Sequence, residues 1–230
     1  MSLPVFDADV NHRRVDVNDW DQLYVVGDVH GCRAELEQML DELDVTEDDL
    51  VVFVGDLVRK GPDSAGVVSM VRDAPNMLTV RGNNEEKLIR GEKHLEELSE
   101  ADMEWIRELP VAISWDGALV VHGGVDPRKP LDEHSVEELE NFRSFTDDDG
   151  NEPYWWEVYQ GPSRVFFGHT PLSAPVDRRY AVGLDTGCVY GNELTAYDWY
   201  GDEYVTVTPE ETAEERKDSK WVHPAVAPVQ

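Results

Sequence analysis

The chain has 230 residues, enough to bury one sizeable hydrophobic core, and its 20 basic against 49 acidic residues give a formal net charge of −29 at pH 7. So negative a surface repels nucleic acid and anionic membranes, and neither is expected as a partner. Because this charge also opposes folding through self-repulsion unless salt screens it, we predict the salt-rich cytoplasm of a halophile, with an ordinary acidic protein of a mesophile as the alternative.

Targeting signals and disulfides are not expected. The N-terminus shows neither the basic nor the apolar region of a secretory signal, and no apolar run approaches the roughly 20 residues of a membrane span. The two cysteines, Cys32 and Cys188, are too few for a disulfide framework, and we interpret both as small buried residues rather than metal ligands. The sequence therefore predicts a soluble cytoplasmic protein.

In the first half of the chain, apolar runs of strand length alternate with helical patterns, as βαβ units require. Leu36, Leu40 and Leu43 form one apolar face of a helix expected over about 33–43. A second helix is expected after Ser64, which suits an N-cap position. The strands predicted in this half cover residues 23–26, 50–54, 77–80, 111–113 and 118–121.

In the second half, Ser135 and Glu138 form a capping-box pattern that predicts a helix running toward Phe142. The later strands are separated by short turns such as Gly191-Asn192, so we expect them to form antiparallel sheet. These strands cover residues 164–167, 181–184, 194–197 and 204–207.

Together these elements predict an α/β sandwich with helices on the outside and no internal repeat. We expect a single domain over residues 1–208, with its core at about 20–208 and an N-terminal extension at 1–18. Residues 209–230, which are charged and then rich in proline, are expected to form a peripheral or mobile tail.

The first of five polar motifs, Gly-Asp-Val-His-Gly at 27–31, lies between a predicted strand and a predicted helix. Side chains two residues apart on an extended chain project to one side, so Asp28 and His30 can bind one metal ion. The alternative is a helix-capping aspartate next to an ordinary loop histidine.

The second motif, Gly-Asp-Leu-Val-Arg-Lys-Gly-Pro at 55–62, places Asp56 at the end of an almost wholly apolar strand. A carboxylate there is costly without a partner, and one metal ion, or two that share the carboxylate, would be a suitable partner. Arg59 and Lys60 follow directly and, in so acidic a chain, suggest phosphate capture. A surface pair that screens nearby carboxylates is the alternative.

Three further motifs again follow apolar runs: Gly-Asn-Asn-Glu at 82–85, His-Gly-Gly at 122–124 and Gly-His-Thr at 168–170. They add Asn83, His122 and His169 to the carboxylates. A lone histidine in such a place is more often bonded to backbone, but this combination predicts a dinuclear hydrolytic site. A donor set without thiolate favours Mn²⁺, with Fe, Zn, Co or Ni as alternatives, over a structural zinc.

The five motifs, together with Leu-Asp-Thr-Gly-Cys at 184–188, resemble those of calcineurin-like metallophosphoesterases, in the branch of phosphoprotein phosphatases and bacterial diadenosine tetraphosphatase. The resemblance runs from about residue 27 to about residue 197. It implies a β-sandwich of two mixed sheets flanked by helices, with Asp56 bridging two divalent cations. It implies the other ligands as well: Asp28 and His30 for the first ion, and Asn83, His122 and His169 for the second.

Two positions depart from the family's pattern. Asn84 stands where the family has a proton-donating histidine, and Arg59 replaces the aspartate that orients this histidine in many phosphatases. Asn84 cannot deliver a proton, so we expect good leaving groups to be preferred, with Arg59 stabilising their negative charge. By the same resemblance, Lys60 matches an arginine that contacts phosphate, and Arg143 is a second candidate for that role.

We therefore predict a metal-dependent phosphohydrolase that attacks phosphomonoesters or phosphoanhydrides with a hydroxide generated by two metals. A Ser/Thr-type protein phosphatase and a dinucleoside polyphosphate hydrolase both agree with the motifs. The expected partner is accordingly a phosphorylated small molecule, a nucleotide or a phosphoprotein. The alternative from another class is a catalytically weakened regulatory protein that binds metal and phosphate. The oligomeric state has no signature in the sequence.

Overall fold

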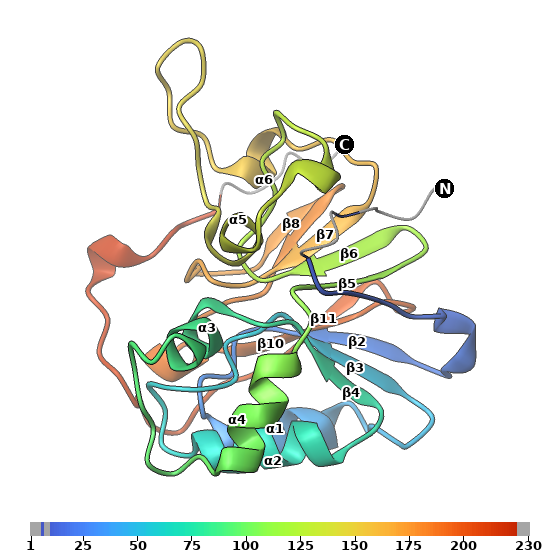
Figure 1. Ribbon diagram of the computed structural model, residues 1–230, viewed down its shortest axis with the longest axis vertical. Coiled ribbons are helices and arrows are strands. Elements are labelled where there is room, and N and C mark those ends of the chain that lie inside the picture. The colour runs from blue at the N-terminus through green and yellow to red at the C-terminus, as the bar shows by residue number, and fades with distance from the viewer. Residues whose placement is uncertain (1–5, 7–9, 225–230) are drawn as a thin grey trace.

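Two mixed β-sheets lie face to face in the computed structural model, which describes residues 6 and 10–224 (Figure 1). In the five-stranded sheet the order is β11 (Glu203–Val207), β10 (Leu194–Asp198), β2 (Leu23–Val26), β3 (Leu50–Phe53) and β4 (Met77–Thr79). In the six-stranded sheet the order is β1 (His12–Arg14), β5 (Ala112–Trp115), β6 (Ala118–Val121), β7 (Arg164–Phe167), β9 (Ala181–Gly183) and β8 (Val176–Arg178). The predicted α/β sandwich is confirmed.

The predicted strands all coincide with observed strands to within two residues at each end, but β1 and β8 were not predicted. The missing β8 explains an error in strand direction. β10 and β11 are antiparallel as expected, whereas β9 runs parallel to β7, as β7 does to β6. The short edge strand β8 reverses the chain before β9 enters the sheet, so the expectation of antiparallel sheet after Phe167 is correct for the β8–β9 and β10–β11 pairs and wrong for β9 against β7.

Helices cover the outer faces of the sandwich (Figure 1). Those packed under the five-stranded sheet are α1 (Arg33–Glu42), α2 (Ser64–Asp73) and α4 (Glu100–Glu108), with α3 (Asn83–Ile89) at its edge. Those beside the six-stranded sheet are α5 (Val136–Asn141) and α6 (Trp155–Val158). Short 3-10 helices lie at Val17–Asp19, Leu131–Glu133, Cys188–Tyr190 and Asp218–Lys220.

Two of the helix N-caps that the sequence predicts can be compared with the structure. Ser135 caps α5 as predicted, because its hydroxyl accepts from the backbone N–H of Glu138 at 3.3 Å. Ser64 does not cap α2 and is instead its first residue. The cap is Asp63, whose carboxylate accepts from Gly66 N at 2.7 Å, while the Ser64 hydroxyl accepts from a backbone N–H outside the helix.

Alternate residues of the central strands face opposite layers, as the period of an extended chain requires. Val25 and Val52 pack with Phe166 in the core between the two sheets. Val26 and Phe53, one residue further on, belong to the core under the helices. Both faces of the five-stranded sheet are therefore buried, which explains the unbroken apolar runs of β2 and β3.

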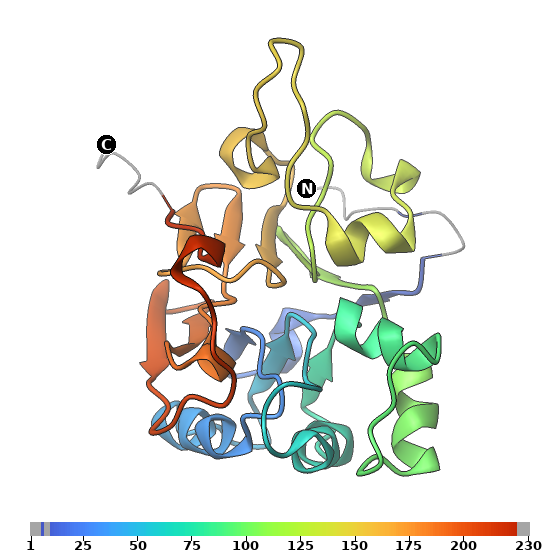
Figure 2. The ribbon, with the colours of Figure 1, turned by 90° about the vertical axis from the view of Figure 1, so that its left-hand side faces the viewer.

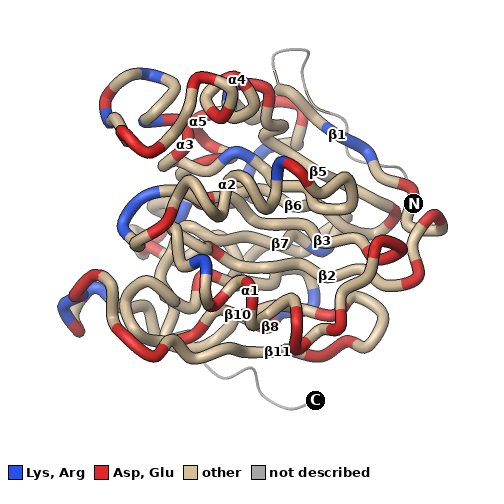
Figure 3. Tube along the Cα trace, turned by 90° about the horizontal axis from the view of Figure 1, so that it is seen from below, with Lys and Arg blue, Asp and Glu red and all other residues tan. Residues whose placement is uncertain are grey.

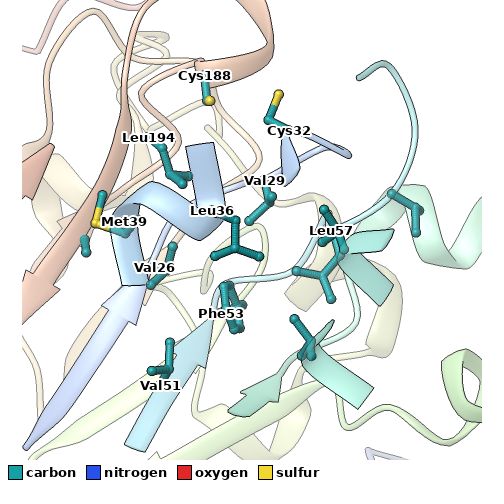
Figure 4. Packing of buried hydrophobic residues seen from close by; sticks show 14 of the residues in the cluster. Val26, Val29, Cys32, Leu36, Met39, Val51, Phe53, Leu57, Cys188 and Leu194 are labelled. Atoms are coloured by element: carbon teal, nitrogen blue, oxygen red, sulfur yellow. The ribbon is translucent and has the colours of Figure 1, made fainter. Parts of the chain in front are cut away.

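Figure 4 shows the core between the five-stranded sheet and α1. Leu36 of α1 packs near Val26 and Phe53 of the sheet. Cys32 and Cys188 lie at the end of this layer that is closest to the polar motifs, and both are buried and free of disulfide bonds. The predicted burial of the cysteines is confirmed.

Both ends of the described chain are joined to the sandwich. At the N-terminal side, β1 pairs in parallel with β5. After β11, residues 208–222 run back across the edge of the molecule, drawn in red in Figure 2. Residues 1–5, 7–9 and 225–230, which include the end of the expected tail, lie outside the described residues. The predicted division into a domain and a tail stays a prediction.

Acidic residues occur along helices and loops in all parts of the described chain, and few of them lie on strands (Figure 3). The negative charge is therefore spread over the whole surface and does not belong to one segment. Within the residues that the structure describes, every helix is too short or too polar to cross a lipid bilayer.

Candidate active site

Six strands, three from each sheet, deliver polar side chains to one site. β2, β3 and β4 are mutually parallel neighbours in one sheet, as β6, β7 and β9 are in the other. Because the carboxyl ends of parallel strands share one edge of a sheet, each sheet presents one row of side chains. The rows are Asp28, Asp56 and Asn83 from the five-stranded sheet, and His122, His169 and Asp185 from the six-stranded sheet.

Asp56 lies at the centre of this cluster. Its Oδ2 is 3.5 Å from Nε2 of His30, and its Oδ1 is 3.4 Å from Nε2 of His122. All three side chains are almost completely buried. A tight turn places the carboxylate there, since Asp56 has a φ of 53° and the preceding Gly55 a φ of 94°. A Cβ at Gly55 would also crowd the backbone of Gly82.

The backbone fixes the orientation of two imidazoles. Nδ1 of His30 is 3.1 Å from the carbonyl oxygen of Val58, and Nδ1 of His122 is 2.8 Å from that of Val54. These bonds place the proton of each neutral ring on Nδ1 and direct the lone pair of Nε2 toward Asp56. A metal-binding histidine is typically held in this way, so the orientation of both rings suits a ligand.

Asp28 connects the two sheets through His169. The backbone N–H of His169 donates to Asp28 Oδ2 at 3.2 Å. Asp28 and His30 do face the same space, with 3.9 Å between Oδ2 and Nε2. The predicted reason was wrong, however, because His30 has a φ of 51° and leaves the extended conformation. His169, with a φ of 67°, shares this rare left-handed backbone, which is typical of functional sites.

The side-chain amide of Asn83 lies beside the imidazole rings of His122 and His169. Its Oδ1 lies 3.2 Å from His122 Nε2 and 3.3 Å from His169 Nδ1. An oxygen beside two ring nitrogens is satisfied if a cation lies among them, if one of the nitrogens carries a proton, or if the amide turns round. In the turned orientation its nitrogen would donate to His122, and its oxygen would accept from Lys87 Nζ at 2.8 Å.

Burial of the side chains and repulsion between their charges are the main causes of the pKa shifts in the cluster. Burial raises the pKa of Asp28 well above its ordinary value, and the charge of Asp185 adds to the effect. Burial also lowers the pKa of His30 to about 3. Burial opposes protonation of His122 too, but the adjacent Asp56 carboxylate outweighs it and raises the pKa of His122 to about 10. A proton on His122 thus compensates the Asp56 charge when no cation does so.

The donor set fits divalent cations. Ligand atoms of Asp28, Asp56 and His122 lie within 4.8 Å of one another in a buried space. Buried carboxylates need positive charge nearby, and carboxylate, amide and imidazole donors suit borderline divalent ions. Lys60 supplies part of that charge, since its Nζ lies 2.6 Å from His30 Nε2. A metal bound to His30 would have to displace this ammonium group.

The two positions that depart from the family's pattern contact each other. Arg59 Nη1 donates to Asn84 Oδ1, and Asn84 Nδ2 donates to Asp56 Oδ2. The backbone N–H of Asn84 also donates to Asp56 Oδ1 at 2.8 Å. The amide is therefore held against the central carboxylate and has no titratable proton to release.

A cavity of about 570 Å³ opens in front of the cluster. Both predicted phosphate-binding residues line it, and Arg143 Nη2 donates to the carbonyl oxygen of His169 at 2.8 Å. Asp28, His30 and His122 lie behind the wall, buried. The predicted site residues on the wall itself are Asp56, Arg59, Lys60, Asn83, Asn84, Arg143 and His169.

Glu85 and Asp185 belong to the site although neither was predicted. The Glu85 carboxylate accepts from the backbone N–H groups of Asp56 at 3.0 Å and Gly82 at 2.8 Å, and so fixes the turn that carries Asp56. Burial raises the pKa of Glu85 to about 7. The signal was present in both cases, because Glu85 ends one polar motif and Asp185 follows an apolar strand.

A β-sandwich whose parallel strands end in carboxylate, amide and imidazole groups beside a cationic cavity belongs to the class of metal-dependent hydrolases. The profile of the calcineurin-like phosphoesterase family matches residues 22–222, and the chain belongs to this family. It is a metallophosphoesterase, a hydrolase of a family that depends on divalent metals.

Two relatives are similar over most of their length. The asymmetrical bis(5'-nucleosyl)-tetraphosphatase PrpE of Halalkalibacterium halodurans is 30% identical over 231 residues, which cover 81% of this chain and 93% of the relative. Serine/threonine-protein phosphatase 1 of Salmonella typhimurium is 28% identical over 220 residues, covering 80% and 94%. The crystal structure of a candidate diadenosine tetraphosphatase superposes with a TM-score of 0.78 at 29% identity, covering 86% of this chain and 98% of that one. The predicted family and fold are confirmed.

Proposed function

We propose that this metallophosphoesterase binds two divalent cations around Asp56 and hydrolyses phosphomonoesters or phosphoanhydrides that have good leaving groups. The observation that carries the proposal is the position of the buried Asp56 carboxylate between Nε2 of His30 and Nε2 of His122. The names of the two relatives point to a dinucleoside tetraphosphate and to a phosphoprotein as substrate classes.

Six side chains are proposed to divide between the two ions. The ions share Asp56, with Asp28 and His30 completing the first set and Asn83, His122 and His169 the second. We propose Mn²⁺ as the metal, with Fe, Zn, Co or Ni as alternatives. When bound, the ions would supply Lewis-acid activation of water and of the phosphoryl oxygens.

The remaining residues would bind the substrate and stabilise its charge. Lys60 and Arg143 line the cavity, and neither forms an ion pair with a carboxylate among the described residues, so both can receive phosphoryl oxygens. Arg59 would stabilise the departing group. Asn84 cannot protonate that group, so an alkoxide should leave slowly, whereas a nucleotide phosphate, with a second pKa near ~6, can leave largely unaided.

Among substrate classes, this reasoning favours a phosphoanhydride such as a dinucleoside polyphosphate over phosphoserine. A Ser/Thr-type phosphatase is the second candidate, supported by the similarity to the Salmonella typhimurium enzyme. A regulatory protein that binds metal and phosphate without turnover is the third, and it rests on Asn84 in place of the general acid. We place the protein in the salt-rich cytoplasm of a halophile because of its charge of −29.

A substrate panel tests these alternatives. The purified chain, loaded with Mn²⁺ in concentrated KCl, is assayed with diadenosine tetraphosphate, 4-nitrophenyl phosphate and phosphoserine. We expect kcat/KM to fall in that order. Faster hydrolysis of phosphoserine than of the aryl ester would contradict the leaving-group argument. Binding of phosphate with no turnover of any substrate, with Mn²⁺ or the alternative metals, would establish the regulatory protein instead.

A further inference from the structure

The segment after β11, residues 208–222, forms one wall of the cavity, and we call it the C-terminal strap. Five of its later residues line the cavity: Arg216, Ser219, Lys220, Trp221 and Val222. The strap is fixed at several points along its length. Glu214 N donates to Val189 O at 2.9 Å, and Val222 N donates to Pro171 O at 3.0 Å.

The strap presents two of its three basic residues to the cavity and its acidic residues elsewhere. Glu210 and Glu211 line a separate cavity beside α1, and no acidic residue of the strap lines the cavity of the active site. Arg216 and Lys220, in contrast, both line it. This separation of charge is not visible in the composition of the segment, which is acidic overall.

The cavity gathers an unusual share of the positive charge of this chain. Six of the 20 basic residues line it, and among the described residues Asp56 is its only acidic lining residue. Within the described chain, none of the six forms an ion pair with a carboxylate, whereas several basic residues elsewhere do, as in Arg81–Glu140 at 2.8 Å. The six are Arg59, Lys60, Lys87, Arg143, Arg216 and Lys220.

Aromatic rings hold the guanidinium of Arg216 in place. It stacks over Tyr190 at 4.8 Å and lies 5.8 Å from the centre of the Trp221 ring. Its Nη2 donates to Lys220 O at 2.8 Å, but its Nε is buried and has no hydrogen-bond partner among the residues that the structure describes. A buried donor without a partner on a charged group is costly, so the site is built for an acceptor that the protein itself does not supply.

The same tyrosine connects Arg216 with the metal-binding motifs. Lys60 Nζ lies 5.3 Å from the centre of the Tyr190 ring, so the charges of Lys60 and Arg216 are no more than about 10 Å apart. Burial lowers the pKa of Arg143, and the charge of Arg216 acts in the same direction. Several cations thus repel one another across one cavity, and an anion with more than one charged group would relieve the repulsion.

A glycine makes room for the strap. Gly187 has a φ of 74°, and a Cβ there would overlap the ring of Trp221. The glycine in Leu-Asp-Thr-Gly-Cys therefore allows Trp221 to pack directly under the loop that carries Asp185. Because Trp221 also stacks near Arg216, this close contact sets the position of the cationic wall relative to the carboxylate cluster.

We propose that Arg216 and Lys220 form a second anion subsite, which binds phosphate groups adjacent to the one being cleaved. This inference rests on the proposed function and narrows it, because such a subsite selects chains of linked phosphates over simple monoesters. Lys60 and Arg143 contact the phosphoryl group that is attacked. Arg216 and Lys220 contact the next phosphates of the chain.

The test compares two substrates that differ in phosphate number and carry no nucleoside. Arg216→Gln and Lys220→Gln are assayed with inorganic tripolyphosphate and with 4-nitrophenyl phosphate, with free Mn²⁺ held constant and in excess. Loss of a charge-assisted hydrogen bond should lower kcat/KM for tripolyphosphate about tenfold or more, equivalent to about 1.4 kcal/mol, relative to the aryl ester. Arg216→Lys, which keeps the charge, should recover part of this selectivity.

Lys217→Gln is the matched control, since it removes the same charge from the same segment at an exposed residue that does not line the cavity. It should leave the ratio of the two kcat/KM values unchanged. If Lys217→Gln changed the ratio of the two kcat/KM values as much as Arg216→Gln does, only the overall charge of the strap would matter. Equal losses on both substrates in Arg216→Gln and Lys220→Gln would show that the strap is merely structural. Either result overturns the proposal.

A binding measurement separates this inference from the proposed function. If the wild-type chain hydrolyses neither substrate, the proposed function fails, but titration calorimetry of the Mn²⁺-loaded protein with tripolyphosphate and orthophosphate still tests the subsite. We expect Arg216→Gln to weaken tripolyphosphate binding about tenfold and orthophosphate binding much less. Equal affinity of wild type and variant for tripolyphosphate would refute the subsite.

Discussion

Arg59 and Asn84 form a hydrogen-bonded pair beside the central carboxylate of the site, with the guanidinium donating to the amide oxygen. From the resemblance of the motifs to those of the family, we expect an aspartate and a proton-donating histidine at these two positions in relatives. In this chain the two positions also contact each other, but an arginine and an asparagine form the contact instead of an aspartate and a histidine. A cation now supports a neutral amide, and neither group can release a proton near neutral pH.

Restoring the histidine should therefore broaden the range of substrates. We expect Asn84→His, combined with Arg59→Asp to orient the ring, to raise kcat for an alkyl phosphate such as phosphoserine by about 10²-fold, the lower end of the range for general acid catalysis. Hydrolysis of 4-nitrophenyl phosphate should change far less. Steady-state kinetics on both esters measures the effect, and no gain on the alkyl ester would refute the leaving-group argument.

Removing the shared carboxylate should remove the metals. We expect Asp56→Asn to lose at least one bound ion per chain and, with it, at least about 100-fold in kcat/KM, since even supporting contacts of ligands contribute 10–100-fold. Metal content after gel filtration is measured by mass spectrometry beside the assay. Asp132→Asn, at an exposed position that does not line the cavity, is the control. Full metal content in Asp56→Asn would contradict the bridging role.

Glu140 should make stability fall with rising pH. It is buried, its Oε2 has no hydrogen-bond partner in the described part of the chain, and burial raises its pKa to about 7 although Arg81 opposes the shift. The folded protein therefore retains this proton in a pH range where the unfolded chain, with a pKa near 4.5, has lost it. Stability should decrease between pH 4.5 and 7, by at most about 1.4 kcal/mol per pH unit from this group.

Urea unfolding of Glu140→Gln at several pH values checks this sign. The variant cannot ionise, so its stability relative to wild type should improve steadily across the interval and then level off above pH 7. Glu37→Gln, at an exposed helical position, should show no such trend. Parallel stability curves for wild type and Glu140→Gln would show that the carboxyl is not the titrating group.

Salt should stabilise the fold strongly. The formal charge of −29 is spread over the whole surface, and its repulsion is screened within about 10 Å at 0.1 M salt but within about 3 Å at 1 M. We expect the thermal midpoint to rise by more than about 5 °C between 0.1 and 2 M KCl, a shift that corresponds to about 1 kcal/mol or more for a domain of this size. Equimolar sucrose separates general solute exclusion from charge screening, and an equal effect of sucrose would contradict screening.

The two thiols should be unreactive in the folded protein. Cys188 is buried, and its contact with Cys32, followed by burial, raises its pKa above the ordinary value. Since the thiolate is the reactive form, Ellman's reagent at pH 8 should label neither cysteine rapidly in native protein and both rapidly in guanidinium. Fast labelling of one thiol in the native state would show that this layer of the core opens.

The strand-end residues were predictable because their signal is local. Asp56 and His122 each follow an apolar run, and an apolar run that ends in a charged or imidazole group already indicates both a strand and a site. The same rule would have found Asp185. Its role as a ligand or as a neighbour of ligands depends on distances, which no sequence pattern gives.

The cationic wall could not be predicted in the same way. Arg216 and Lys220 lie in a segment whose acidic composition indicates a solvated tail, and their side chains reach the cavity only because the segment folds back over Tyr190. Likewise, the contact between Arg59 and Asn84 depends on a left-handed turn at Arg59, with a φ of 70°. Long-range packing and unusual backbone angles are set by the whole fold, and local patterns do not encode them.

Each sheet contributes one row of three side chains to the cluster, and this shared construction has a consequence for stability. Neither sheet can form the site alone. The five-stranded sheet carries Asp28, Asp56 and Asn83 at its strand ends, and the six-stranded sheet carries His122 and His169. Cations bound between the two rows would link the two sheets. Chelation should then loosen the whole molecule, and any substitution that lets one sheet slide over the other should weaken metal affinity from a distance.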